Sequence, residues 1–172
     1  MKKVWAVYFS GTGTTKKTVN FIADKLAEKF KTKKEIFDFT LPEARKIVKE
    51  FDKNDIVIFG TPVIAGRVPN VLLKYLDTLK GNGALAVPVV LFGNRDFNDA
   101  LMELSDILAK DGFKPIGAGA FIGEHSFSKI LAQGRPDEDD MKIMEEFSNK
   151  IYEKITGENF NSDIFVEITH GE

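Results

Sequence analysis

The chain has 172 residues, of which 43% are hydrophobic and 29% are charged, and this suits one globular domain with a full hydrophobic core. Its formal net charge of −2 provides no strong attraction for nucleic acid or for an anionic membrane. The absence of cysteine excludes disulfides, cysteine-ligated iron–sulfur clusters and thiol catalysis in this chain, and two histidines are too few for a typical histidine-based zinc site.

The N-terminus is basic, but the apolar run behind it covers only residues 4–9, which is too short for the apolar core of a signal peptide. No other stretch is long and apolar enough to span a bilayer. We therefore expect a cytoplasmic protein that binds neither membranes nor nucleic acid.

Strand-like and helix-like segments alternate along the chain. Apolar runs rich in β-branched and aromatic residues, as buried parallel strands require, cover residues 4–9, 35–39, 55–60, 86–92 and 114–122. Apolar residues at helical spacing follow them at residues 19–30, 44–51, 69–79, 101–108 and 137–154. Thr40 and Glu43 form a capping-box pattern before the second of these helices, and Pro69 is suited to open the third.

This alternation predicts an α/β fold, a three-layer sandwich in which helices cover both faces of a five-stranded parallel sheet. Each crossover between parallel strands should be right-handed. No repeat or linker divides the chain, so we predict one domain over residues 1–156 and a C-terminal tail over residues 157–172, which contains the short stretch "DIFVEI".

Six small residues separate the first expected strand from the first helix: Ser10, Gly11, Thr12, Gly13, Thr14 and Thr15. Ligands of open parallel sheets bind beyond the carboxyl ends of the strands, and the first N–H groups of a helix attract anions. The two glycines allow an anion to approach the backbone, and the four hydroxyl groups add neutral donors. One hydroxyl would suffice to cap the helix, so this pattern favours a phosphate site over a simple cap.

Two common phosphate-binding motifs fit poorly. The stretch "GTGTTKKT" carries Lys16 where the P-loop has the glycine that precedes its lysine. Lys16 also stands where the third glycine of the dinucleotide fingerprint packs against the strand, although Asp38 could serve as the ribose-binding acid of that motif.

The stretch "YFSGTGTTKKTV" instead resembles the phosphate loop of flavodoxins, which surround the FMN phosphate with hydroxyl and backbone N–H groups. The segments "GTPVIAGRVPN" and "FGNRDFNDAL" follow the third and fourth expected strands, where flavodoxins hold the flavin ring. The stretches "GRVPN", "GNR" and "GEHSFS" are similar to those of the flavodoxin modules of flavodoxin–ferredoxin fusion proteins. The resemblance covers residues 2–154 and implies a doubly wound, flavodoxin-like sheet in the order 2-1-3-4-5 with bound FMN.

The resemblance assigns FMN binding to three loops and implies neither a catalytic residue nor a metal. The assigned residues are Ser10, Gly11, Thr12, Gly13, Thr14 and Thr15 in the first loop, Thr61, Pro62, Val63, Ile64, Ala65 and Gly66 in the second, and Gly93, Asn94, Arg95 and Phe97 in the third. The acidic run at residues 135–140 could suggest a metal cluster, but acidic residues at a helix N-terminus also complement the helix dipole, which we favour.

The expected flavin loops depart from ordinary flavodoxins. Flavodoxins often stack the ring between aromatic side chains, whereas these loops offer Ile64 and Phe97, and Phe97 could equally pack in the core. Arg67 and Arg95 also lie here. If their guanidinium groups point toward the ring, the positive charge is expected to raise its reduction potential, whereas they could instead reach into solvent or pair with Asp96 or Asp99. Because the chain has no cysteine, a ferredoxin partner would be another polypeptide.

Three functions remain open. The resemblance favours an electron carrier whose FMN exchanges electrons with a redox partner protein, such as a ferredoxin. The alternative is an FMN-dependent reductase of a small-molecule acceptor, in which His125, after the fifth expected strand, could help to protonate the acceptor or could merely hold its loop. The third is a flavodoxin-fold binding module that has lost its flavin.

Overall fold

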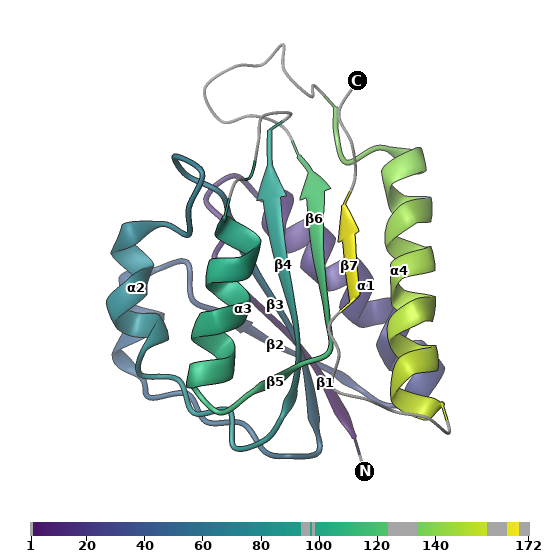
Figure 1. Cartoon of the computed structure of the whole chain (residues 1–172), viewed down its shortest axis with the longest axis horizontal. Helices are drawn as coiled ribbons and strands as arrows, with labels where there is room; N and C mark the ends of the chain where they lie inside the picture. Colours follow the sequence, from purple (N-terminus) through teal and green to yellow (C-terminus); the bar gives the residue numbers. More distant parts are fainter. Residues whose placement is uncertain (1, 94–96, 98, 124–133, 158–164, 169–172) are drawn as a thin grey trace.

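The computed structural model of this chain describes residues 2–93, 97, 99–123, 134–157 and 165–168, which form a parallel sheet between two layers of helices (Figure 1). The strands are β1 (Lys3–Tyr8), β2 (Lys34–Asp38), β3 (Asp55–Pro62), β4 (Leu85–Phe92), β5 (Lys114–Pro115), β6 (Gly117–Ile122) and β7 (Phe165–Ile168). The helices are α1 (Thr14–Phe30), α2 (Asn70–Leu76), α3 (Ala100–Lys110) and α4 (Glu138–Thr156), with a 3₁₀ helix, η1 (Pro42–Lys46).

The sheet has seven strands within the described residues. Six of them lie in the order β2-β1-β3-β4-β6-β7, and β5 pairs with β4 at the start of that strand. Every pairing is parallel. The chain runs from β1 outward to β2 and returns on the other side of β1 as β3, which makes the β1/β3 boundary the point where the strand order reverses.

Two hydrophobic clusters hold the three layers together. Helices α1 and α4 cover one face of the sheet, and α2 and α3 cover the other (Figure 1). Because successive side chains of a strand point to opposite faces, Ile58 of β3 joins Leu26 of α1 and Phe147 of α4 in one cluster, whereas Phe59 joins Leu72 of α2 in the other. All five side chains are fully buried.

The prediction of five strands was wrong in two places. Residues 114–122 form two strands because the pairing with β4 shifts by one residue, from Leu85 opposite Lys114 to Val89 opposite Gly119, so one extra residue bulges out between β5 and β6. The segment 165–168, which was expected in the tail, adds β7 beside β6. The observed order therefore replaces the predicted order 2-1-3-4-5.

The predicted helix over residues 44–51 was also wrong, since only η1 forms there. Thr40 does not act as its cap: Leu41 occupies the N-cap position, and Thr40 Oγ1 accepts from the backbone N–H of Ser10 at 2.9 Å instead. Beyond η1 the chain is extended, and the backbone N–H of Phe51 donates to the carbonyl of Lys80 at 2.8 Å. These long-range contacts hold an apolar stripe outside the helical conformation, and Ile47 and Val48 are 59% and 58% exposed.

The other helices were predicted in the right places, with small differences at their ends. Helix α2 ends at Leu76, three residues before the predicted end. Helix α4 begins after Asp137, and Asp137 and Asp140 form a reciprocal capping box at 2.9 and 3.0 Å. Arg135 also forms an ion pair with Asp140, so the acidic run is used to start a helix. None of the helices in the described part of the chain is long and apolar enough to cross a membrane.

Candidate functional site

The loops that follow β1, β3 and β4 leave the sheet at the same edge, because the strands are parallel. Backbone hydrogen bonds continue the ladder into these loops. The N–H of Phe9 donates to the carbonyl of Gly60 at 3.1 Å, that of Val63 to Leu91 at 2.9 Å, and that of Gly123 to Phe92 at 2.9 Å. The strand ends therefore hold the starts of all three predicted loops in a fixed arrangement.

Ser10 organises the first loop from within. Its Oγ accepts hydrogen bonds from the backbone N–H groups of Gly13 and Lys16, each at 3.1 Å. Its own backbone N–H donates to Thr40 Oγ1 at 2.9 Å, which ties the loop to the end of β2. Gly13 has a φ of 91°, a left-handed conformation that favours glycine. Ser10 therefore serves as a scaffold that shapes the loop.

Several other donors of this loop are free. The backbone N–H groups of Thr12, Thr14 and Thr15 have no hydrogen-bond partner among the described residues. A Cβ atom built on Gly11 or Gly13 would meet nothing within 4 Å, so open space lies beside the backbone. Unpaired N–H groups at a helix N-terminus next to open space can bind an anion.

The threonine side chains of the loop differ in their surroundings. Thr12 is exposed and its hydroxyl group lies 3.4 Å from that of Thr14, which is partly buried. Thr15 is only 3% exposed, and its methyl group lies 3.0 Å from where a Cβ on Gly60 would be. The hydroxyl groups of Thr12 and Thr14 and the backbone N–H of Thr15 are thus the better candidates for contact with an anion.

Gly123 is a residue of the site that the sequence did not reveal. It directly follows β6, and a Cβ atom there would lie 2.2 Å from Cγ2 of Thr14. This close contact places the end of β6 against the first turn of α1. In the sequence, Gly123 opens the stretch "GEHSFS" after the fifth expected strand, but nothing there indicates its contact with Thr14.

The second loop projects a tight turn from the end of β3. The backbone groups of Ile64 and Arg67 exchange hydrogen bonds at 2.9 and 3.1 Å, and Ala65 and Gly66 between them have φ values of 52° and 75°. Positive φ at both central positions is typical of a type I′ turn. Ile64 is 52% exposed, whereas Pro62 and Val63 are partly buried. Thr61 is fully buried, and its Oγ1 has no partner within the described part of the chain.

Arg67 points toward α3. Its guanidinium group forms a double hydrogen bond with Oε2 of Glu103, of which the Nε contact measures 3.1 Å. The hydrogen bond from Arg67 lowers the pKa of the Glu103 carboxyl, and Glu103 in turn raises the pKa of Arg67. Arg67 is therefore paired, and its partner is Glu103 of α3 rather than Asp96 or Asp99, the two partners considered from the sequence.

The third loop is described in part. Gly93 and Phe97 lie at its two ends, and Phe97 packs on Phe92 with ring centroids 5.3 Å apart. Phe97 is also partly buried against the core under α2 and α3. Asn94 and Arg95, two predicted FMN-binding residues, lie outside the described residues, as does His125.

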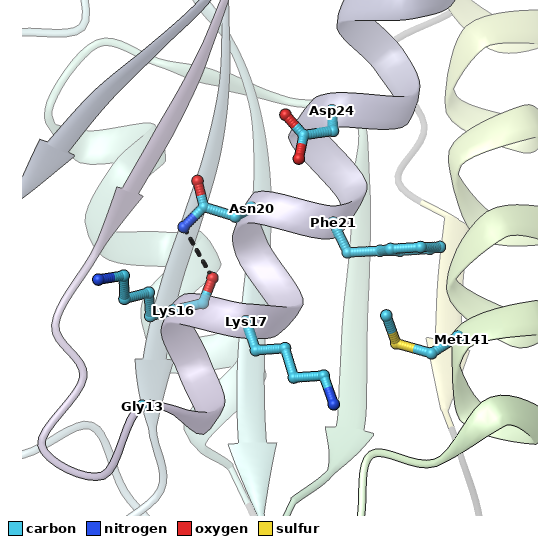
Figure 2. Close-up of a pocket in the computed structure, with 7 residues that line it drawn as sticks. All are labelled: Gly13, Lys16, Lys17, Asn20, Phe21, Asp24 and Met141. Atoms are coloured by element: carbon cyan, nitrogen blue, oxygen red, sulfur yellow. Dashed lines mark hydrogen bonds between the residues drawn. The ribbon is translucent and has the colours of Figure 1, made fainter.

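An open groove of about 490 Å³ runs along α1 from Gly13 to Asp24 and reaches Met141 of α4 (Figure 2). Figure 2 shows Phe21 and Met141 between the two helices and the side chains of Lys16 and Lys17 projecting in different directions. Lys17 Nζ donates to the carbonyl of Pro136 at 3.4 Å. The two ammonium groups therefore do not converge on the loop, and no described residue of the second or third loop lines the groove.

Solved structures with the same arrangement are numerous. The oxidised flavodoxin 2 of Bacillus cereus is 16% identical, with a TM-score of 0.62 over 90% of this chain and 99% of that one. The FMN-bound flavodoxin of Fusobacterium nucleatum is 19% identical, with a TM-score of 0.58 over 90% of this chain and 99% of that one. The chain has the flavodoxin fold.

A neighbour with a different activity shares this flavodoxin fold. The apo form of an NADH:FMN oxidoreductase is 17% identical, with a TM-score of 0.62 over 95% of each chain. No protein-family model and no curated protein matches the sequence. At such low identities the similarity establishes the fold and leaves the function to be argued from the site.

Proposed function

We propose that this flavodoxin-fold protein binds FMN non-covalently and transfers electrons. The observation that carries the proposal is the set of unpaired N–H donors at Thr12, Thr14 and Thr15, beside open space at the N-terminus of α1. Neutral donors and a helix dipole suit the terminal phosphate of FMN. The donors lie next to β1 and β3, where the strand order reverses, and flavodoxin binds its FMN at this switch point.

The other two loops would hold the flavin ring. Residues 61–66 would contribute backbone groups and the exposed side chain of Ile64, and the buried, unpaired hydroxyl of Thr61 is a free polar group at the base of this loop. Gly93, Asn94, Arg95 and Phe97 would contribute the opposite side. When bound, FMN would supply the redox chemistry, whereas the protein binds, orients and electrostatically tunes it.

We further propose an electron carrier of the cytoplasm, whose partner is a redox protein such as a ferredoxin. Support comes from the similarity of "GRVPN", "GNR" and "GEHSFS" to modules that are fused to ferredoxin domains. These 172 residues contain no cysteine, so they cannot themselves ligate the iron–sulfur cluster of such a partner.

A reductase is the second candidate, because an NADH:FMN oxidoreductase has the same fold and a similar length. Titration of the apoprotein with FMN, followed by the quenching of flavin fluorescence, tests the cofactor. The FMN-loaded protein is then mixed anaerobically either with NADH or with a reduced ferredoxin. The carrier predicts rapid reduction by ferredoxin and slow reduction by NADH. The reverse result supports a reductase, and a failure to bind FMN supports a flavin-free module.

A further inference from the structure

The side chain of Glu103 joins the second loop to helix α3. Its two carboxylate oxygens have different partners: Oε2 accepts from the guanidinium group of Arg67, and Oε1 accepts from the backbone N–H of Val68 at 2.9 Å. The side chain of Glu103 is 16% exposed, whereas that of Arg67 is 60% exposed. The carboxylate of Glu103, more than 30 residues away in sequence, therefore binds both the charged side chain of Arg67 and the backbone of Val68 in the second loop.

The turn at residues 64–67 needs such an anchor. Ala65 is held at a φ of 52°, which an L-residue with a side chain adopts at a cost, and Ile64 and Ala65 are exposed. The start of the loop is fixed by the Val63 hydrogen bond to Leu91 of β4. Glu103 fixes its end, so the position of the turn depends on β4 on one side and on α3 on the other.

Glu103 also lies close in sequence to the third loop. Its backbone N–H donates to the carbonyl of Asp99 at 2.8 Å, and the N–H of Ala100 donates to the carbonyl of Phe97 at 3.1 Å. The first turn of α3 therefore begins where the third loop ends. A single residue of this turn connects the two loops that, under the proposed function, enclose the flavin ring.

The ion pair between Arg67 and Glu103 changes the net charge of the second loop more than it changes the stability of the fold. An ion pair with an exposed partner contributes little to the stability of the fold. However, the carboxylate neutralises Arg67, which would otherwise leave a positive charge in the second loop. A positive charge near a flavin stabilises its reduced, more negative state relative to the oxidised state.

We infer that Glu103 is a positioning residue for the flavin, which anchors the second loop through Val68 and lowers the reduction potential by neutralising Arg67. The inference rests on the proposed function. It assigns a role to an acidic side chain that by sequence alone would be taken as a favourable residue in the first turn of a helix.

Four variants separate the two roles. Glu103→Gln retains an oxygen acceptor for Val68 but loses the charge, and Glu103→Ala loses both. Arg67→Gln removes the cation, and the double variant Arg67→Gln/Glu103→Gln removes both charges. Glu50→Gln is the matched control, because Glu50 forms an exposed ion pair with Lys80 at 3.5 Å in segments that precede β3 and β4, at the opposite edge of the sheet.

The measurements are the potential of the FMN-loaded variants and the hydrogen exchange of the Val68 amide in the apoprotein. For Glu103→Gln we expect reduced flavin to bind at least about threefold more tightly relative to oxidised flavin, which is about 28 mV for a one-electron couple at 59 mV per factor of ten. The double variant should return toward the wild-type potential, and Glu50→Gln should not change it. Glu103→Ala should accelerate Val68 exchange at least about tenfold, whereas Glu103→Gln should not.

An unchanged potential in FMN-loaded Glu103→Gln would overturn the electrostatic role, and unchanged Val68 exchange in Glu103→Ala would overturn the anchoring role. If the wild-type protein binds no FMN, the proposed function fails and the electrostatic role fails with it. The exchange measurement on the apoprotein then still decides whether Glu103 anchors the loop.

Discussion

Gly60 of β3 and Val19 of α1 lie so close together that a Cβ atom on Gly60 would be 2.3 Å from Cγ2 of Val19. The helix therefore packs on the sheet where β3 has no side chain. We expect Gly60→Ala to push α1 away from the sheet and to lower the free energy of unfolding by about 1–3 kcal/mol, as overpacking of a core does. Thermal unfolding measures this as a decrease in Tm of several degrees.

Gly11→Ala is the control for that experiment, because a Cβ on Gly11 would meet nothing within 4 Å. Its Tm should stay within about 2 °C of the wild type, since an open surface position accommodates a methyl group. Equal Tm values for Gly60→Ala and the wild type would show that α1 does not depend on this close contact.

The contact between Gly123 and Thr14 predicts a coupled pair of variants. Gly123→Ala places a Cβ 2.2 Å from the methyl group of Thr14 and should displace the first turn of α1, so that FMN binds at least about tenfold more weakly. Thr14→Ser removes that methyl group and keeps the hydroxyl. In the double variant FMN affinity should therefore recover. Fluorescence titration of the wild type, the two single variants and the double variant gives the coupling free energy between the two positions. Purely additive losses would contradict a direct steric contact.

Asp111 predicts a dependence of stability on pH. Its Oδ2 is buried without a partner among the described residues, and burial, with a smaller effect of Asp77, raises the pKa of its carboxyl from 3.8 to about 7. Because the pKa of Asp111 is higher in the folded state, the folded protein holds this proton more tightly than the unfolded chain does. The stability that this proton contributes is complete below about pH 4 and is lost as the pH rises through about 7. Because the side chain is partly exposed, we expect solvent to limit the loss to about 1–2 kcal/mol.

Denaturant unfolding at pH 5 and pH 8 tests this, with Asp111→Asn compared with the wild type. Asn cannot ionise, so the variant should lose less stability between the two pH values. Asp106→Asn, at an exposed position of α3, the helix that Asp111 caps at its C-terminus, should behave as the wild type does. The same pH dependence in Asp111→Asn and the wild type would show that Asp111 does not titrate in this range.

Lys16 and Lys17, beside the proposed phosphate loop, should contribute less to FMN affinity than their positions in the sequence suggest. The side chains of Lys16 and Lys17 project in different directions along the outer groove (Figure 2). We expect Lys16→Ala and Lys17→Ala each to weaken FMN binding by less than about threefold, since exposed charges contribute little. A loss of tenfold or more at low salt in either variant would show that its ammonium group reaches the phosphate.

Most strands and helices could be predicted from the spacing of apolar residues along the sequence. The alternation of buried strands with helices such as α1 and α4 predicted the α/β class. Of the predicted loop from Ser10 to Thr15, the first four residues lie between β1 and α1, whereas Thr14 and Thr15 already belong to the first turn of α1. The apolar stripe at Ala44, Ile47, Val48 and Phe51 misled the prediction. Pairing with Lys80 decides the conformation of that segment, and a contact between segments so far apart leaves no local signal.

The parts of the candidate site that were missed also depend on contacts between distant residues. Glu103 and Arg67 are 36 residues apart, and an acidic residue in the first turn of a helix has an ordinary explanation in the helix dipole. Likewise, Ser10 was predicted only as a phosphate contact, and the two hydrogen bonds that its Oγ accepts from its own loop are a second role that the sequence did not indicate. Such roles follow from the three-dimensional arrangement and not from residue type.

The comparison of FMN with riboflavin tests the central claim most directly, because the two ligands differ only in the phosphate. Isothermal titration of the apoprotein with each ligand gives the two Kd values. Two charge-assisted hydrogen bonds from the loop, at about 1.5 kcal/mol each, should make FMN bind about a hundredfold more tightly than riboflavin. Equal affinities for the two ligands would contradict the assignment of residues 10–15 as a phosphate-binding loop.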